Sequence, residues 1–477
     1  MSEGRPPLRL VPGGRRGTPP DQGSAQGSGN GEAPDAPEGA AISSPPDLRA
    51  ARELTAAGTG LVLSFVLMAQ LGSWTRALGT FQALYAIGFV FFALALARVG
   101  TRVVPRAGLI VFAVALAARL ALLPVTPTLS DDIYRYVWEG KVAAHGGDPW
   151  RQSPNDASLV HLRDRTIHPR INHPELAAIY PPLAVAGFAV VATLSPTVLA
   201  MKSWVLLNDL ALVLVLLAWA RRRRHGAQAV IAYAWNPLVV VEYAGSGHYD
   251  PIAIVWLVAA LLWAERRPAL SALALAIGVL TRLAPLAALP FLLMRWPWRS
   301  RVLALVTIGL GLGWFWSRTR GPDSGLGAYW RSWSNNELVF AYLARAAGDP
   351  RLARAVALAL VVALVVFLAW RGRAAAIATR TTMRAGFLLS PVAHPWYLGW
   401  VLALEPIALP APSAPSAPWL LLSLTAVLSY GVLASPAEGS DFHLPLAWRW
   451  VEYGLPLLLA IAIGAARWRS RGHAGAR

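Results

Sequence analysis

The sequence predicts an all-helical protein that crosses a membrane many times. Of its 477 residues, 56% are hydrophobic and only 14% are charged, whereas soluble domains carry about a quarter charged residues. The hydrophobic residues also gather into runs close to the roughly 20 residues that cross a bilayer as a helix. These two observations exclude a soluble fold.

Fourteen hydrophobic runs are long enough, or nearly long enough, to cross. They lie at 54–74, 80–98, 107–124, 178–195, 198–220, 228–244, 249–264, 268–293, 301–317, 352–370, 375–392, 396–411, 418–434 and 447–466. An even number places both termini on one side. Basic residues flanking the first and last runs identify that side as cytoplasmic, because short cytoplasmic loops are enriched in Lys and Arg. The basic loop at 221–224 would then face outward, against this rule.

These runs predict a simple organisation. Residues 1–50 form a cytoplasmic tail, residues 51–470 form the transmembrane domain, and residues 471–477 form a second cytoplasmic tail. Within the domain, residues 125–177 and 318–350 form two extracytoplasmic loops. The first tail is rich in Gly, Pro and Ser and lacks apolar periodicity, which is typical of disorder.

The net charge of +18 arises from 43 basic and 25 acidic residues. The excess lies beyond residue 50, in short loops between the predicted spans, where cations flank anionic lipid headgroups. The charge therefore indicates a lipid bilayer as partner and not nucleic acid. The sequence has no cysteine, which excludes disulfides, thiolate metal sites and cysteine nucleophiles.

The most informative segment follows the third run and reads TLSDDIYRYVWEGKVAAHGGDPW. If residues 132–145 are helical, Asp132, Arg135 and Glu139 share a polar face, opposite an apolar face. This pattern predicts an interfacial helix lying on the bilayer, which would hold a carboxylate at headgroup depth. Alternatively, Asp131 and Asp132 simply cap the helix, with Ser130 assisting.

A second segment, INHPELAAIYPPLAVAGF, leads the fourth run. Its double proline is typical of the first turn of a helix, where proline loses no needed N–H bond. The order of an Asp-Asp loop and then a YPPL span resembles the GT-C superfamily of membrane glycosyltransferases that use polyprenyl-phosphate sugars. Further segments resemble those of bacterial polyprenyl-phosphate-mannose dependent mannosyltransferases. They are YAWNPLVVVEYAGSGHYDPIAI, LTRLAPLAALPFL and VAHPWYLGW.

The resemblance implies an all-helical GT-C fold and a role for particular residues. Asp132 matches the acidic residue that begins D-x-Y-x-Y, the family's general base, and Asp131 is its neighbour or substitute. Some relatives have D-x-D, so which carboxylate acts stays open. Arg282 stands where the family usually has Lys. The planar guanidinium of arginine replaces the compact charge of lysine and still suits a phosphate.

Eleven further residues are candidates for substrate binding. They are Arg135, Glu139, His173, Glu175, Tyr180, Glu242, His248, Asp250, Arg282, His394 and Tyr397. Ionisable groups within spans are functional by default, and Arg282 is expected inside an apolar helix, far from either end. Each has a structural alternative: Asp250 can cap a helix, Glu242 can pair, and the aromatic residues can form an interfacial belt.

Weaker candidates lie elsewhere. Arg331, Asn335, Asn336 and Glu337 occupy the second loop, where they could close over a donor. Lys202 and Asp209 lie seven residues apart on one predicted helix and are expected to pair with each other.

The sequence therefore predicts a multi-pass glycosyltransferase of the cell membrane, plasma or inner, with its site on the extracytoplasmic side. It would transfer a sugar, most readily mannose, from a polyprenyl phosphate to a hydroxyl of a glycan, glycolipid or protein, with inversion. No cofactor is required, although Asp131 and Asp132 could bind Mg²⁺ or Mn²⁺ together with phosphate. The rival prediction is a lipid or solute transporter or flippase, with Glu242, His248, Asp250 and Arg282 along its pathway.

Overall fold

The computed structural model describes residues 47–99, 104–222, 226–321, 324–408, 416–433 and 444–474. This part of the chain is helical, and its one isolated β-bridge joins Asn335 to Val392. The all-helical prediction is confirmed. Nearly all of the tail expected at 1–50, and Arg223 and Arg224 of the basic loop at 221–224, lie outside the described residues.

Six helices of the described part are long and apolar enough to cross a membrane. They are α1 (Leu48–Ala69), α2 (Leu78–Val99), α6 (Val198–Arg222), α12 (Trp298–Thr319), α15 (Pro350–Trp370) and α19 (Leu446–Ala474). Their outer faces carry large exposed apolar side chains such as Leu207, Leu310 and Val366, which water would not favour. These helices are consistent with a polytopic membrane protein, and the count of fourteen spans stays a prediction.

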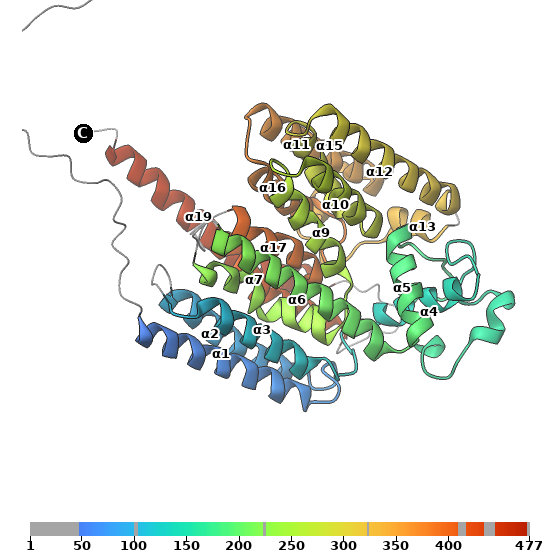
Figure 1. Ribbon diagram of the computed structural model, residues 1–477, viewed down its shortest axis with the longest axis horizontal. Coiled ribbons are helices and arrows are strands. Elements are labelled where there is room, and N and C mark those ends of the chain that lie inside the picture. The colour runs from blue at the N-terminus through green and yellow to red at the C-terminus, as the bar shows by residue number, and fades with distance from the viewer. Residues whose placement is uncertain are drawn as a thin grey trace, which may run out of the picture. The chain divides into compact units, whose positions relative to one another are not determined.

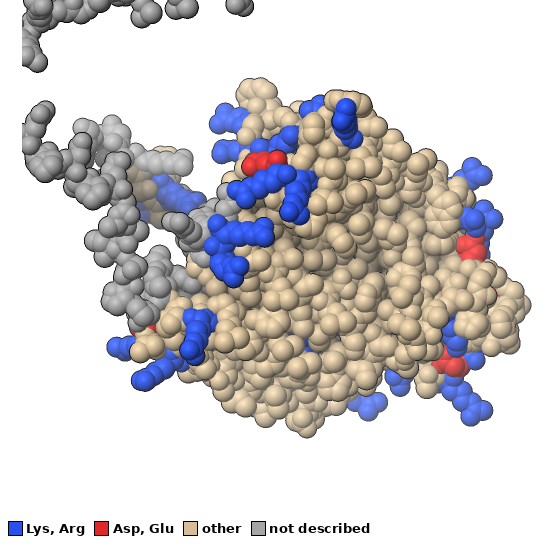
Figure 2. Space-filling model, in the orientation of Figure 1, with Lys and Arg blue, Asp and Glu red and all other residues tan. Residues whose placement is uncertain are grey.

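Charged side chains on one face of the molecule are separated by an uncharged surface (Figure 2). On the face drawn in Figure 2, Lys and Arg gather toward opposite ends of the view, and uncharged surface lies between them. Comparison with Figure 1 places one charged end beside α4 and α5, and the other beside the far ends of α12 and α16.

The N-terminal helices α1, α2 and α3 (Ala107–Leu122) pack together, and α3 also contacts α6 (Figure 1). A fully buried ion pair joins Arg119 of α3 to Asp209 of α6, with Nε and Oδ2 2.7 Å apart. Lys202 does not pair with Asp209 as expected. Its Nζ donates to the carbonyls of Leu122 and Val125 at the end of α3, where the helix dipole favours a cation.

Several apolar runs predicted as continuous spans are broken helices. The run at 228–244 is divided into η3 (Ala227–Val230), α7 (Ile231–Ala234), α8 (Pro237–Val240) and the π-helical turn η4 (Val241–Gly245). The run at 268–293 is divided into α10 (Pro268–Thr281), η5 (Ala284–Ala288) and α11 (Leu289–Leu293). Single-turn π-helices often occur at functional sites, and η4 carries Glu242.

Arg282 accordingly does not lie inside a helix. It follows the last residue of α10 with an extended backbone, and η5 begins at Ala284 with Pro285 in its first turn. The expectation that Arg282 sits deep in a continuous helix was therefore wrong, and the break gives its side chain room to turn toward a cavity.

The remaining helices of the second half are α9 (Asp250–Trp263), α13 (Gly325–Ser332), α14 (Val339–Ala347), α16 (Ala375–Leu389), η6 (Pro395–Tyr397), α17 (Leu398–Ala408), α18 (Ala417–Thr425) and η7 (Ala426–Leu433). Of these helices, α9 and α16 contact η5 at this break. Contacts join α9 to α10, α15 to α16, α16 to α17 and α18 to α19.

The predicted acidic helix forms as α4 (Asp132–Ala144), and α5 (Pro182–Leu194) begins at the second proline of YPPL. Helix α4 packs on α5 through Gly140, where a Cβ would lie 2.4 Å from the Phe188 carbonyl oxygen. Both faces of α4 are buried, including Arg135 and Glu139. A helix lying on the bilayer with a solvated polar face is therefore not confirmed.

Candidate active site

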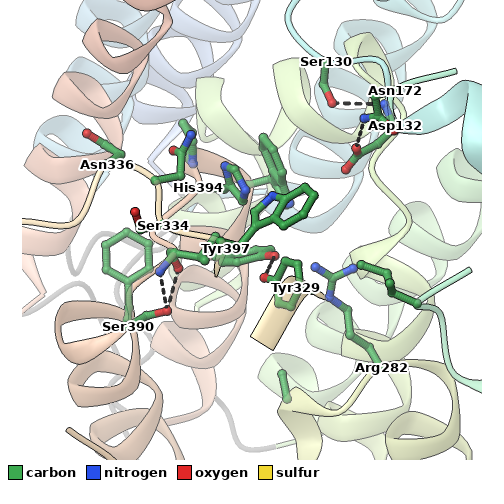
Figure 3. A pocket seen from close by; sticks show the side chains of 18 of the residues that line it. Ser130, Asp132, Asn172, Arg282, Tyr329, Ser334, Asn336, Ser390, His394 and Tyr397 are labelled. Atoms are coloured by element: carbon green, nitrogen blue, oxygen red, sulfur yellow. Dashed lines mark hydrogen bonds between the residues drawn. The ribbon is translucent and has the colours of Figure 1, made fainter. Parts of the chain in front are cut away.

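A cavity of about 1020 Å³ opens beside the start of α4. Its wall combines α4, the segment at 172–181, the break after α10, α13, and the segment at 390–397. Ligand cavities commonly reach about 1,000 Å³, so this one has room for two substrates. Figure 3 shows Asp132 and Arg282 bordering the same space, with Tyr329, Tyr397 and His394 beside them.

Asp132 is held in a defined orientation at the edge of the cavity. The side-chain amide of Asn172 donates to its Oδ1 at 3.0 Å, and the Asp132 backbone N–H donates to the Ser130 hydroxyl at 3.3 Å. Burial raises its pKa, although the Asn172 hydrogen bond and the charges of Arg282 and Arg135 act in the opposite direction. Such a carboxylate is a stronger base than an exposed one.

Asp131 occupies a different environment. It precedes the first residue of α4 but its side chain makes no capping hydrogen bond, so the capping alternative is not supported. Its side chain also lines the cavity, and its pKa is raised by burial and by the neighbouring Asp132. No group of three or more His, Cys, Asp or Glu side chains in the described part could hold a metal ion. A divalent cation at Asp131 and Asp132 stays a prediction.

Arg135 anchors the segment that presents Asn172. Its guanidinium donates to the carbonyls of Asn172, His173 and Leu176 at 2.9 to 3.2 Å, and to the Glu139 carboxylate at 2.6 Å. Glu139 lies behind Arg135 and does not line the cavity. These two residues therefore fix the loop that orients Asp132.

His173 and Tyr180 line the cavity from the same segment. His173 has a left-handed backbone, with φ of 47°, and its ring meets Trp333 edge to face at 4.6 Å. Oε1 of Glu175 lies 3.5 Å from Nδ1 of His173. The Glu175 side chain is largely exposed and does not line the cavity. The ring contact joins the first loop to the second.

Arg282 supplies a positioned cation to the cavity. Its Nε lies 3.1 Å from Oδ1 of Asp250, a carboxylate that also accepts from the Trp400 indole N–H at 2.6 Å. The rings of Tyr249 and Tyr397 flank the guanidinium at 4.8 and 5.1 Å, within cation–π range. The guanidinium lines the cavity with its orientation fixed from behind, an arrangement suited to binding a phosphate.

An aromatic stack forms another part of the wall. The rings of His394 and His248 both stack on the Trp396 ring, with centroids 4.1 and 3.7 Å away and nearly parallel planes. His394 and Trp396 line the cavity, whereas His248, Glu242 and Asp250 are buried behind the wall. Glu242 accepts from the Tyr430 hydroxyl at 2.6 Å.

The structure thus brings most of the predicted residues to one cavity or to positions directly behind its wall. Asp131, Asp132, Arg135, His173, Tyr180, Arg282, His394 and Tyr397 line the cavity, and Glu139, Glu175, Glu242, His248 and Asp250 do not. Of the second-loop candidates, Asn335 and Asn336 line it, and Glu337 instead pairs with Arg449 of α19.

Sequence reasoning missed four residues of this site. Asn172, Tyr249, Tyr329 and Tyr430 border the cavity, and only the first two lie in motifs that drew attention. Tyr329 is brought in because α13 approaches the first loop through Gly325, where a Cβ would lie 2.1 Å from the Ala177 carbonyl oxygen. No local signal at Tyr430 predicts this position.

Comparison with known proteins gives one family. Residues 53–298, more than half of the chain, match the model described as alpha-(1->6)-mannopyranosyltransferase, N-terminal domain. The chain belongs to this family. No curated protein and no solved structure matches. Membership supports a glycosyltransferase, in agreement with the resemblance to GT-C mannosyltransferases, and the matched residues include Asp132, Asn172 and Arg282. Tyr329, His394 and Tyr397 lie beyond them.

Proposed function

We propose that the protein transfers mannose from a polyprenyl-phosphate donor to a hydroxyl on the extracytoplasmic side of the cell membrane. Asp132 removes the proton of the acceptor hydroxyl, and Arg282 stabilises the phosphate as the anomeric bond breaks. Attack from the face opposite the phosphate inverts the anomeric centre. The acceptor is a glycan, a glycolipid or a protein. The proposed steps do not need a divalent cation, although Asp131 and Asp132 could bind one together with the phosphate.

The observation that carries the proposal is that a half-buried carboxylate, Asp132, and a positioned guanidinium, Arg282, border one cavity (Figure 3). The cavity also has an apolar side, formed by Leu283 and by residues of η5, α15 and α16, namely Ala287, Val361, Met383 and Phe387. Because α15 is long and apolar enough to cross a membrane, this side suits the isoprenoid part of a donor whose phosphate lies at Arg282.

The rival function is a lipid or solute transporter. For that function the buried ionisable residues Glu242, His248, Asp250 and Arg282 would line a pathway. Only Arg282 of these four lines the cavity in the described part of the chain, and Asp250 is engaged by Arg282 and Trp400. This pattern favours the enzyme.

Transfer in vitro tests the proposed function. The purified protein in lipid nanodiscs is supplied with polyprenyl-phosphate mannose, glucose or arabinose, and with membrane extract as acceptor; nucleotide-activated mannose is the control donor. We expect a mannosylated product from the lipid donor alone. Transfer from the nucleotide sugar, or no product from any donor, would contradict the proposal.

A further inference from the structure

A row of ionisable side chains runs from Asp132 behind the wall of the cavity. Nδ1 of His248 lies 3.8 Å from Oδ2 of Asp132, and Nε2 of His248 lies 3.6 Å from Oε2 of Glu242. Oε1 of Glu242 accepts from the Tyr430 hydroxyl. His248 is 1% exposed and Glu242 is completely buried. The row therefore begins and ends at residues that line the cavity, Asp132 and Tyr430.

On His248 and Glu242, the atoms that face along this row are unpaired within the described part of the chain. Oε2 of Glu242 and both ring nitrogens of His248 are buried and have no hydrogen-bond partner among the described residues. Leaving polar atoms unpaired at such depth costs free energy. A proton between Nε2 of His248 and Oε2 of Glu242 would give each of these two atoms a hydrogen-bond partner. The distances exceed a hydrogen bond, but contacts in substrate-free sites are often long and tighten when substrate binds.

The position of the imidazole is fixed by packing. The His248 ring lies flat against Trp396 at 3.7 Å, and Gly247, with φ of 80°, turns the chain immediately before it. Asn172 holds the other oxygen of Asp132, so Oδ2 is the oxygen directed toward His248. A proton on Oδ2 would therefore have one ring nitrogen nearby to receive it.

We propose that His248 and Glu242 are positioning residues that receive and hold the acceptor's proton after Asp132 has removed it. This inference rests on the proposed function. The acceptor O–H bond breaks, its proton goes to Asp132, and its oxygen forms the new bond to the anomeric carbon. The bond from that carbon to the phosphate oxygen breaks, and its electron pair leaves with the phosphate. The proton then moves from Asp132 to Nδ1 of His248, where the carboxylate of Glu242 stabilises the imidazolium.

Other titratable groups surround the row. Those facing His248, besides Asp132 and Glu242, are His394 and Arg282. Those facing Glu242 are Tyr430, Tyr85 and Asp250. Because the guanidinium of Arg282 opposes protonation of His248, Glu242 is the group whose negative charge favours it.

The substitution Glu242→Gln tests the inference, because it keeps the shape of the side chain and removes its charge. We expect kcat to fall about ten- to a hundredfold, with the KM for the lipid donor unchanged. The acid limb of the pH profile of kcat/KM should move to lower pH, because losing a nearby negative charge weakens the base. A purely structural role would not move that limb.

Two tyrosine variants provide a matched comparison. Tyr430→Phe removes a hydrogen bond that stabilises the Glu242 carboxylate, so Glu242 loses its negative charge more readily and the acid limb should move in the same direction as in Glu242→Gln, by a smaller amount. Tyr85→Phe removes a comparable buried hydroxyl that donates to the Ser423 carbonyl, and should leave the profile unchanged. If Glu242→Gln fails to insert, the Tyr430→Phe profile decides the question.

Three results would overturn the inference. They are a Glu242→Gln profile that superimposes on the wild type, a loss of kcat without a shift of the acid limb, and an unshifted limb in Tyr430→Phe. With Asp132→Asn inactive, these results leave the proposed function standing. A wild-type protein that transfers no lipid-borne sugar, or a fully active Asp132→Asn, would defeat the proposed function and this inference together.

Discussion

Replacing Asp132 with asparagine should abolish sugar transfer while the protein stays folded and inserted. The amide keeps the size of the carboxyl group and can still bond to Asn172 through its oxygen, but it cannot accept the proton of a hydroxyl. General-base catalysis contributes about 10²- to 10⁴-fold, so kcat should fall by that factor. The measurement is initial-rate transfer from polyprenyl-phosphate mannose, with thermal unfolding in detergent as the check on folding.

Asp131→Asn is the matched control for this variant. It changes an adjacent carboxyl group that lines the same cavity but is not held by Asn172. We expect a much smaller loss of kcat than for Asp132→Asn. The reverse order would transfer the role of base to Asp131, and near-normal turnover in both variants would remove the carboxylate from the mechanism.

The pH dependence of the wild type follows from the same group. A base works only when deprotonated, and burial raises the pKa of Asp132 above its ordinary value of 3.8. The rate should therefore be constant at neutral pH and fall as pH decreases through the raised pKa, before an exposed aspartate would protonate. This acid limb should be missing from the residual activity of Asp132→Asn.

Removing the charge of Arg282 should have the second-largest effect. The loss of one group that stabilises developing charge typically lowers kcat by about 10²- to 10³-fold, and a phosphate contact would also be lost from the bound donor. We expect Arg282→Met to lower kcat and to raise the KM for the lipid donor, with little change in the KM for the acceptor. Initial rates at varied concentrations of each substrate separate these effects.

Arg282→Met also leaves the completely buried Asp250 without its cation. Breaking a buried ion pair on one side costs about 3 to 5 kcal/mol. The double variant Arg282→Met/Asp250→Asn restores neutrality and should recover stability without recovering activity.

Arg282→Lys keeps a cation and should retain more activity than either Arg282→Met or the double variant. An Arg282→Met protein with normal donor KM and kcat would exclude Arg282 from phosphate binding.

The local signals in the sequence predicted the elements of this site well. Helical periodicity predicted a helix over 132–145, where α4 spans Asp132–Ala144, and the double proline indicated the start of α5. Periodicity and proline restrict the chain within a few residues. These local signals do not predict a cavity. A carboxylate beside a cavity was predicted from the resemblance to GT-C enzymes.

Breaks and partners were harder to predict, for a physical reason. A high hydropathy indicates that a segment avoids water, but it does not indicate whether the backbone stays helical. The apolar runs therefore did not predict the helix interruptions at η4 and Arg282. Partners depend on neighbouring helices. Lys202 and Asp209 do share a helix, but each points to a group on or beyond α3, which no spacing within one helix reveals.

For the proposed transfer reaction, the cavity beside Asp132 must open on the extracytoplasmic side. Because the chain has no cysteine, single cysteines at exposed positions can be labelled in intact cells with a membrane-impermeant thiol reagent. Ala157 lies in the first loop and Ala374 precedes α16, and both are exposed. We expect Ala157→Cys to be labelled in intact cells and Ala374→Cys only after permeabilisation. Labelling of Ala157→Cys only after permeabilisation would place the Asp132 loop in the cytoplasm and contradict the account.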